Sequence, residues 1–422
     1  MHVWPDDERL AVALKDPSGF RRVIAISRAG SGVHPIYDQA IALDIEQEEL
    51  PLSPGSVDCI IVGDMMARLR EPGDVLHRLA KLLAPSGELL ATIPNVQHHA
   101  MVSALLRGDW QYGSVVGLDH GHVRQWTYST AIKLFLDAGL VPEIVQRIDV
   151  PALASFVQAA EPLMRYLGLH PGRTAGYLAA SHYVMRARAR PNEVTEGREE
   201  PMSFVTCVSD EAQFRANLLS SPCFKPGNPH ELLPFANCAN AAEGLNAGLA
   251  RAQHRIVVCV HQDVYLPCGW PARFLAQWRE GEQRFGRIGV AGVYGVAGAG
   301  PRARRTGFVV DRERVLAELP PLPARVDSLD ELLLALPRRT SVRFDGGLGF
   351  HFYGSDICLQ VMEQNQSAVV LDALCFHNSR SVGLPPSFFT SALVFASKWQ
   401  QRLPVATSCV QIQADRSMAQ WC

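Results

Sequence analysis

The chain has 422 residues, 47% of them hydrophobic and 19% charged, with a formal net charge of −2. This length predicts two or three domains, and the near-neutral charge argues against a protein that wraps nucleic acid or coats an anionic membrane. The sequence has no apolar run of about 18 residues, and its start lacks the basic and apolar segments of a signal peptide. We therefore expect a cytoplasmic protein with small-molecule or carbohydrate partners and no nucleic-acid partner.

The ten cysteines are scattered along the chain. None forms a Cys-x-x-Cys pair, and several lie inside apolar runs. This pattern favours buried, reduced thiols over a disulfide framework or a zinc site.

Strands and helices alternate in the first half of the chain. Apolar runs predict strands at residues 21–27, 40–45, 57–64 and 88–94, and an amphipathic pattern predicts a helix over residues 72–87 that ends at a glycine. Such alternation is typical of a mostly parallel, doubly wound sheet.

A charged stretch with two prolines, RARARPNEVTEGREEP, has no helix or strand period and predicts a linker. We place one domain at residues 1–187, the linker at 188–201 and a second domain at 202–422. The second half also alternates, which predicts another α/β domain. Its expected strands cover residues 203–210, 255–260, 288–295 and 369–377, and its expected helices cover 243–252, 271–285 and 387–399.

Residues 50–95 contain two strands that end in Gly63-Asp64 and Pro94-Asn95. Ligands of doubly wound sheets bind outside such carboxyl ends. Together with GHVRQWTYSTAIKLFLDAGL further on, this segment resembles class I methyltransferases that use S-adenosylmethionine. The resemblance covers roughly residues 22–187 and implies a Rossmann-like sheet.

The family's cofactor-binding features are missing from this half. No Gly-x-Gly-x-Gly precedes residues 21–27, and the position that holds the cofactor ribose is Ser27, which cannot accept two strong hydrogen bonds as a carboxylate does. The segment 29–32, AGSG, is typical of an ordinary surface turn. We therefore expect no S-adenosylmethionine binding. The domain would serve for docking to a protein partner or for oligomerisation.

Two histidine clusters, His98-His99 and His120-x-His122, have no cysteine or carboxylate at ligand spacing. We interpret them as exposed loop histidines.

In the second half, the apolar run 256–260 stops at His261-Gln262-Asp263. A carboxylate at the end of a buried strand can lie in the crevice at the sheet's edge and hold a hard cation. Sugar transfer from a nucleotide diphosphate needs such a cation, because the leaving phosphate gains negative charge. This tripeptide resembles the metal motif, usually Asp-x-Asp, of GT-A glycosyltransferases.

The surrounding segments match one branch of that superfamily in order and spacing. The resemblance spans about residues 203–381 and implies a GT-A fold for the second domain. The matching segments are NAAEGLNAGLARAQHRIVVCVHQDVYLPCGW, RVDSLDELLLAL, RFDGGLGFHFYGSDICLQ and VVLDALCFHNS.

The resemblance assigns metal and catalytic positions. Asp263 matches the last acid of the metal motif, and His377 matches a late histidine that often completes the metal shell. An imidazole with a carboxylate suits Mn²⁺ as well as Mg²⁺. His261 replaces the first acid of the motif. Asp356 matches the base that takes the proton of the acceptor hydroxyl in inverting enzymes.

Further positions are assigned to the nucleotide sugar. Asp210, His261 and Gln262 lie where the family contacts the nucleotide sugar. Asp330 lies in a strand that commonly lines the acceptor or sugar pocket. The aromatic rings of Trp270 and Tyr353 could stack on the apolar faces of sugars.

Each residue also has a purely structural interpretation. Asp356 could cap the following helix, His377 could end a strand in a hydrogen-bonded turn, Asp263 could face water, and Trp270 could pack at a helix start. The occurrence of several motifs in the expected order favours the functional interpretation of Asp263 and Asp356.

The sequence therefore predicts a metal-assisted, inverting glycosyltransferase that moves a sugar from a nucleotide-diphosphate sugar to a glycan, a lipid-linked glycan or another hydroxyl acceptor. Bacterial surface polysaccharide synthesis is the expected context, by family analogy. The alternatives are an S-adenosylmethionine-dependent methyltransferase acting on a glycan, and a non-catalytic scaffold. The helix at 387–399 could touch the inner face of a membrane, although core packing is favoured.

Overall fold

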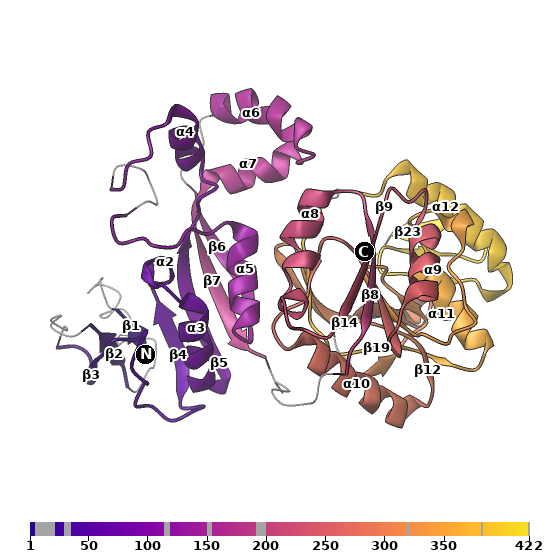
Figure 1. Ribbon diagram of the computed structural model, residues 1–422, viewed down its shortest axis with the longest axis horizontal. Helices are drawn as coiled ribbons and strands as arrows, with labels where there is room; N and C mark the ends of the chain where they lie inside the picture. The colour runs from indigo at the N-terminus through magenta and orange to yellow at the C-terminus, as the bar shows by residue number, and fades with distance from the viewer. Residues whose placement is uncertain are drawn as a thin grey trace. The chain divides into compact units, whose positions relative to one another are not determined.

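The computed structural model describes residues 1–4, 22–28, 35–113, 119–149, 154–190, 200–318, 321–380 and 383–420. Contacts divide the chain into two units, Met1–Glu193 and Val194–Cys422, each with its own sheet (Figure 1). Most of the predicted linker at 188–201 lies outside the described residues, and its first two residues end strand β7 (Ala180–Ala189). Within the described ranges, no helix has the length and apolarity needed to cross a membrane.

The N-terminal unit contains a seven-stranded sheet in the order β3-β2-β1-β4-β5-β7-β6. The first five strands are parallel, and β7 runs antiparallel to both β5 and β6. The order reverses direction at β1, which confirms the doubly wound arrangement. The strands are β1 (His2–Val3), β2 (Ile24–Ser27), β3 (Gln39–Ala42), β4 (Val57–Val62), β5 (Leu83–Pro94), β6 (Leu140–Asp149) and β7.

Helix α3 (Pro72–Leu82) ends five residues before the predicted Gly87, and β5 begins at once. The C-cap residue Leu83 already has an extended backbone. Pro85 explains the early end, because proline lacks the N–H that the helix would need and disfavours a helical residue before it.

The histidine clusters were expected to be exposed, and this was wrong for two of the four residues. His98 and His122 are 1% and 5% exposed. His98 caps helix α4 (His99–Arg107) by accepting a hydrogen bond from the Ala100 N–H at 3.4 Å. Burial lowers its pKa to about 4, so this histidine is neutral at pH 7.

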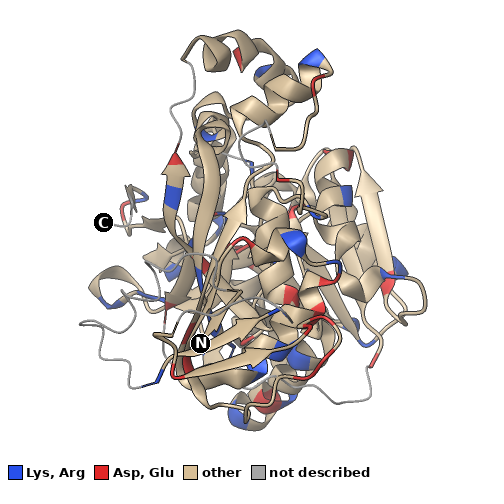
Figure 2. Ribbon diagram, turned by 90° about the vertical axis from the view of Figure 1, so that its left-hand side faces the viewer, with Lys and Arg blue, Asp and Glu red and all other residues tan. Residues whose placement is uncertain are grey.

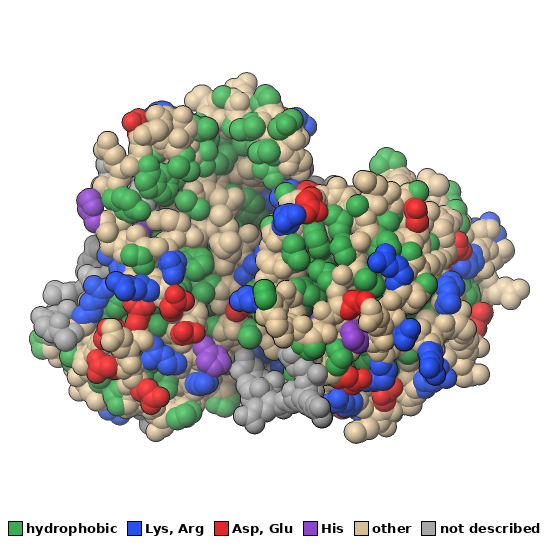
Figure 3. Space-filling model, viewed as in Figure 1, with side chains coloured by type: hydrophobic (Ala, Val, Ile, Leu, Met, Phe, Trp, Pro, Cys, Tyr) green, Lys and Arg blue, Asp and Glu red, His purple; other side chains and the backbone are tan. Residues whose placement is uncertain are grey.

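Apolar side chains gather on the surface of the N-terminal unit over α4 and α6 (Ala154–Tyr166) (Figure 3). Leu106 is 72% exposed and Tyr166 is 86% exposed. Charged residues, by contrast, are scattered over the elements of both units, with both signs interspersed in the part of the chain that is drawn (Figure 2).

The C-terminal unit is built on a mixed seven-stranded sheet in the order β16-β19-β12-β18-β10-β8-β9. Strands β9, β8 and β10 are parallel, and β18 is antiparallel to both β10 and β12. The strands are β8 (Ser203–Val208), β9 (Glu231–Ala236), β10 (Ile256–Val260), β12 (Ile288–Gly292), β16 (Ala324–Arg325), β18 (Leu333–Pro337) and β19 (Ser367–Val370).

Two apolar cores cover the two faces of this sheet. One contains Trp270, Phe274 and Trp278 of helix α10 (Trp270–Phe285), and the other contains side chains of α9 (Ala241–Arg251) and α11 (Tyr353–Glu363). Both α9 and α10 were predicted almost at their observed positions. The period of apolar residues at three- and four-residue spacing makes such helices readable from sequence.

A second sheet joins segments that are distant in sequence. Its order is β11 (Val264–Tyr265), β20 (Phe376–His377), β14 (Arg304–Asp311), β13 (Tyr294–Ala297) and β17 (Ser328–Leu329), with β15 (Arg314–Glu318) beside β14. The predicted strand at 369–377 is thus two short strands, β19 and β20, in different sheets. Helix α12 (Pro386–Lys398) packs with α11 and strands β21 (Val405–Ala406) and β22 (Val410–Ile412), which form a small sheet with β23 (Met418–Gln420).

Helix α9 approaches strand β8 very closely at Gly248. A Cβ atom there would lie 2.2 Å from Cγ1 of Val205 and 2.6 Å from its Cγ2. Since Val205 is fully buried, its branched side chain cannot turn away.

We expect Gly248→Ala to lower the free energy of unfolding by about 1–3 kcal/mol, because overpacking outweighs the gain in helix propensity. Chemical denaturation of the intact chain measures this loss. Ala250→Ser, which adds one atom at an exposed position of the same helix, should change stability little. A stability equal to that of the unaltered protein would contradict the close-packing argument.

Candidate active site

Strand β10 ends in a polar turn at the edge of the main sheet. Its five residues, Ile256–Val260, are all buried, so the chain leaves the core at His261. The turn is closed by a hydrogen bond from the Val264 N–H to the His261 carbonyl at 3.2 Å. It therefore points the His261 and Asp263 side chains away from the core strand.

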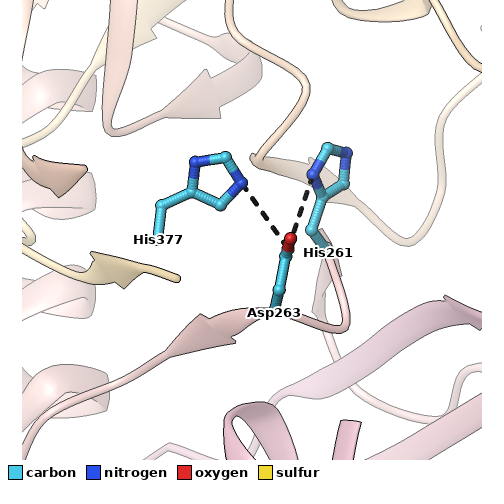
Figure 4. A group of neighbouring side chains, drawn as sticks. All are labelled: His261, Asp263 and His377. Carbon is cyan, nitrogen blue, oxygen red and sulfur yellow. Dashed lines mark ion pairs between the residues drawn. The ribbon is translucent and has the colours of Figure 1, made fainter. Parts of the chain in front are cut away.

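Strand β20 brings His377 to the same place. In the antiparallel ladder of β11 with β20, Val264 lies opposite His377, and the Asn378 N–H donates to the Asp263 carbonyl at 2.9 Å. Figure 4 shows the three side chains converging, two from the turn and one from the facing strand.

The carboxylate of Asp263 lies between two imidazoles. Its Oδ1 is 3.5 Å from Nε2 of His377 and 3.9 Å from Nδ1 of His261. One ligand atom from each of the three residues lies within 4.8 Å of the others, which is close enough for one cation to contact all three. Two imidazole nitrogens and a carboxylate oxygen are donors that Mn²⁺ and similar cations accept.

Hydrogen bonds orient the two imidazoles. Nδ1 of His377 lies 2.9 Å from Oδ1 of Asp311, so the ring donates its Nδ1–H there and directs its Nε2 atom toward Asp263. Nε2 of His261 lies 2.8 Å from the Tyr353 hydroxyl, which itself donates to the Glu331 carbonyl at 3.4 Å. His261 therefore donates from Nε2 and keeps its Nδ1 lone pair on the Asp263 side.

The charge state of each residue in the cluster depends on its neighbours. Burial disfavours the charged form of His377, but the charges and hydrogen bonds of Asp263 and Asp311 outweigh burial and raise its pKa to about 10. Burial likewise opposes ionisation of Asp263, yet His377 and His261 bring the pKa of this carboxyl to about 2. Burial lowers the pKa of His261. Without a cation, a charged His377 therefore bridges two carboxylates.

A pocket of about 410 Å³ opens beside this cluster. It is lined by the ends of β8 and β10, the turn His261–Asp263 and the start of α9 and α11. The Gln262 side chain closes one wall, because its Oε1 accepts from the N–H groups of Ser209 and Asp210 at 2.9 and 3.0 Å. The lining residues are Cys207, Val208, Ser209, Asn237, Cys238, Ala241, Leu245, Cys259, Val260, His261, Gln262, Asp263, Glu331, Phe350 and Tyr353.

Asp210 and Asp330 lie near the pocket with their carboxylates engaged. Asp210 caps α8 (Glu211–Ala216) by accepting from the Gln213 N–H at 3.0 Å, and it pairs with Arg380 at 2.9 Å. Asp330 accepts from the Leu332 N–H at 3.0 Å. Both stay candidates for nucleotide-sugar contacts.

Trp270 differs from the sugar-stacking role that was expected. It has no exposed surface, stacks on Phe274 with ring centroids 4.8 Å apart, and donates its indole N–H to the Ala373 carbonyl at 3.0 Å. The aromatic spacing of α10 explains this, since residues four apart share one face of a helix. The packing interpretation accounts for Trp270.

Asp356 also differs from its expected position as a base. It is 0% exposed and is absent from the described residues that line the pocket. Its Oδ1 accepts from the Trp399 indole N–H and from Lys398 Nζ, both at 2.7 Å, and its Oδ2 accepts from Gln360 at 2.6 Å. These three donors come from α11 and the end of α12, so the carboxylate joins the two helices.

Two residues of the site were not found from the sequence, Asp311 and Glu331. Asp311 stands at the end of β14, opposite His377 in the parallel ladder with β20. Glu331 directly follows Asp330, which was predicted, but Glu331 itself was not. Only the strand register would have indicated Asp311 and Glu331, and the sequence does not give that register.

We expect Asp356→Ala to lower the free energy of unfolding by about 1–3 kcal/mol, because the buried Trp399 N–H loses its acceptor. Denaturant unfolding of the full chain tests this. Asp345→Ala is the matched control, because Asp345 pairs with the same Lys398 at 2.7 Å but lies at the surface. Equal effects of the two variants would contradict a structural role for Asp356.

Comparison with known proteins agrees with this arrangement for the second half. Residues 203–397 match the family described as "Glycosyltransferase like family". A comparison with curated proteins gave no match.

Among solved structures, the chain is similar to several methyltransferases. One is a SAM-dependent methyltransferase from Thermotoga maritima, at 15% identity and a TM-score of 0.32, covering 45% of this chain and 80% of that one. Another, from Archaeoglobus fulgidus, has 10% identity and a TM-score of 0.30, with coverages of 44% and 83%. The chain is also similar to the YcgJ protein from Bacillus subtilis, with 12% identity, a TM-score of 0.30 and coverages of 45% and 91%. Likeness at this level gives no information about activity.

The chain thus joins an N-terminal α/β unit to a second unit in which residues 203–397 match a glycosyltransferase-like family.

Proposed function

We propose that the protein is a metal-assisted glycosyltransferase that moves a sugar from a nucleotide-diphosphate sugar to a hydroxyl acceptor. The observation that carries this proposal is the cluster of His261, Asp263 and His377 beside a pocket of about 410 Å³, inside the glycosyltransferase-like domain. A pocket of this size is within the range for small-molecule sites.

The donor set fits a divalent cation. Asp263 and His377 would hold it, with His261 as a third ligand, and Asp311 and Tyr353 keep both imidazole lone pairs directed inward. Imidazole ligands favour Mn²⁺ over Mg²⁺, which prefers oxygen. When bound, the cation would neutralise the charge that develops on the leaving diphosphate.

In this proposal the donor lies in the pocket. The nucleotide would lie toward Ser209 and Asp210, whose N–H groups donate to the Gln262 amide, and Asp330 would lie toward the sugar. Attack by the acceptor hydroxyl opposite the leaving group, in one displacement, inverts the anomeric centre. We propose a glycan or lipid-linked glycan acceptor in bacterial surface polysaccharide synthesis, on the family resemblance.

The N-terminal unit would serve as a docking or oligomerisation module in this proposal. Its exposed apolar side chains over α4 and α6 support a contact surface, because exposed apolar patches often mark interaction sites. The segments 5–21 and 29–34, between β1 and β3, lie outside the described residues, so the expected lack of S-adenosylmethionine binding stays a prediction.

A thermal-shift panel with Mn²⁺ plus UDP, GDP, dTDP or CMP, and separately with S-adenosylmethionine, tests the donor class. A nucleotide at a hundred times its dissociation constant stabilises by about 2.7 kcal/mol. We expect one nucleotide to raise the melting temperature only with Mn²⁺, and Asp263→Asn to abolish that shift and to lower donor turnover by about 100-fold or more. The exposed variant Asp415→Asn is the control. A shift with S-adenosylmethionine alone would favour the methyltransferase function.

Asp311→Asn should weaken Mn²⁺ binding by about 10–100-fold, because the His377 imidazole loses the charged partner that orients it. Titration calorimetry measures the affinity. Unchanged affinity would contradict the role of Asp311 in orienting His377 for the cation.

A further inference from the structure

A carboxylate in the pocket stands where an acceptor proton could be received. Among the described residues that line the pocket, Asp263 and Glu331 carry the carboxylates. Asp263 faces the two imidazoles, and the buried Asp356 is held by three donors. Glu331 is thus the carboxylate left for a substrate.

The strand register puts Glu331 beside the turn His261–Asp263. Val260, the last residue of β10, pairs with Leu333 of β18 in an antiparallel ladder. Beyond this pair, the His261 N–H donates a hydrogen bond to the Leu332 carbonyl at 3.0 Å. Glu331 is the residue before Leu332, and its backbone carbonyl accepts a hydrogen bond from the Tyr353 hydroxyl at 3.4 Å.

The Glu331 side chain lies beside the start of helix α11. Gly354 allows this approach, because a Cβ atom there would lie 2.5 Å from the Leu329 carbonyl oxygen and 3.4 Å from Cγ of Glu331. Close contact with the backbone of α11 restricts this side chain, as a group that must orient a substrate requires.

We propose that Glu331 is the general base of the transfer reaction, in place of Asp356. This inference rests on the proposed glycosyltransferase function. The acceptor oxygen forms a bond to the anomeric carbon while the bond from that carbon to the diphosphate oxygen breaks. The nucleoside diphosphate leaves with the bonding electron pair, and the hydroxyl proton goes to a Glu331 carboxylate oxygen.

The electrostatics of the pocket suit this role. Burial raises the pKa of Glu331 to about 8, neighbouring Asp330 adds to the rise, and the backbone N–H groups oppose it. A carboxylate with a raised pKa binds a proton more strongly than an exposed one. Its ionised form, which acts as the base, increases as the pH rises through about 8.

The test measures nucleoside diphosphate released from UDP-glucose, GDP-mannose and dTDP-rhamnose with Mn²⁺, using water or a simple sugar as the acceptor. Glu331→Gln should lower the rate by about 100-fold or more while Mn²⁺ and nucleotide affinities change little. Glu331→Ala should regain activity with added formate, which replaces the missing carboxylate. Glu363→Gln, exposed on α11, is the control.

The outcomes distinguish a failure of the general-base proposal from a failure of the proposed glycosyltransferase function. A rate for Glu331→Gln within about threefold of the unaltered protein, with Asp263→Asn inactive, would overturn the base and leave the glycosyltransferase standing. Loss of activity together with nucleotide affinity, without rescue by formate, would make Glu331 a structural residue. An unaltered protein that neither binds nor turns over any of the donors would remove the proposed function and this inference with it.

Discussion

The position of the Asp263 carboxylate between two imidazoles is the constraint on which the site depends. The ring centroids of His261 and His377 are 5.9 Å apart, and two protonated imidazoles would repel at this distance. One ring must therefore be neutral, or a metal cation must replace the protons between the rings and Asp263. Asp311 and Tyr353 settle which ring nitrogens face inward. The second sheet makes this arrangement possible, since β14 and β20 bring Asp311 and His377 beside the turn that follows β10.

The sequence predicted the parts of the fold that repeat at short range. Helix α10 follows from the spacing of Trp270, Phe274 and Trp278, and β10 follows from five successive apolar residues. The two-residue strand β1 has no detectable period, yet it lies between β2 and β4 inside the N-terminal sheet. Proline and the following extended residues, rather than the apolar pattern, set the end of α3.

The candidate site shows the same division. Residues next to one another in the turn, His261 and Asp263, were found because a buried strand that ends in polar groups is unusual. Asp356 was assigned by motif order, but its surroundings depend on Lys398 and Trp399, which lie more than forty positions later and reach it only after α12 packs on α11. Glu331 and Asp311 depend on strand register, which local patterns do not encode.

The ladder of β11 with β20 has only two residue pairs, Val264 with His377 and Tyr265 with Phe376. A cation held by Asp263 and His377 would therefore act as a reversible cross-link that closes a long loop of chain containing β12 to β19. Loops of this length cost the unfolded chain much of its entropy when they are clipped. Resistance of the second unit to proteolysis should then increase with the concentration of the free cation. The same ion would contribute to the stability of the protein as well as to its chemistry.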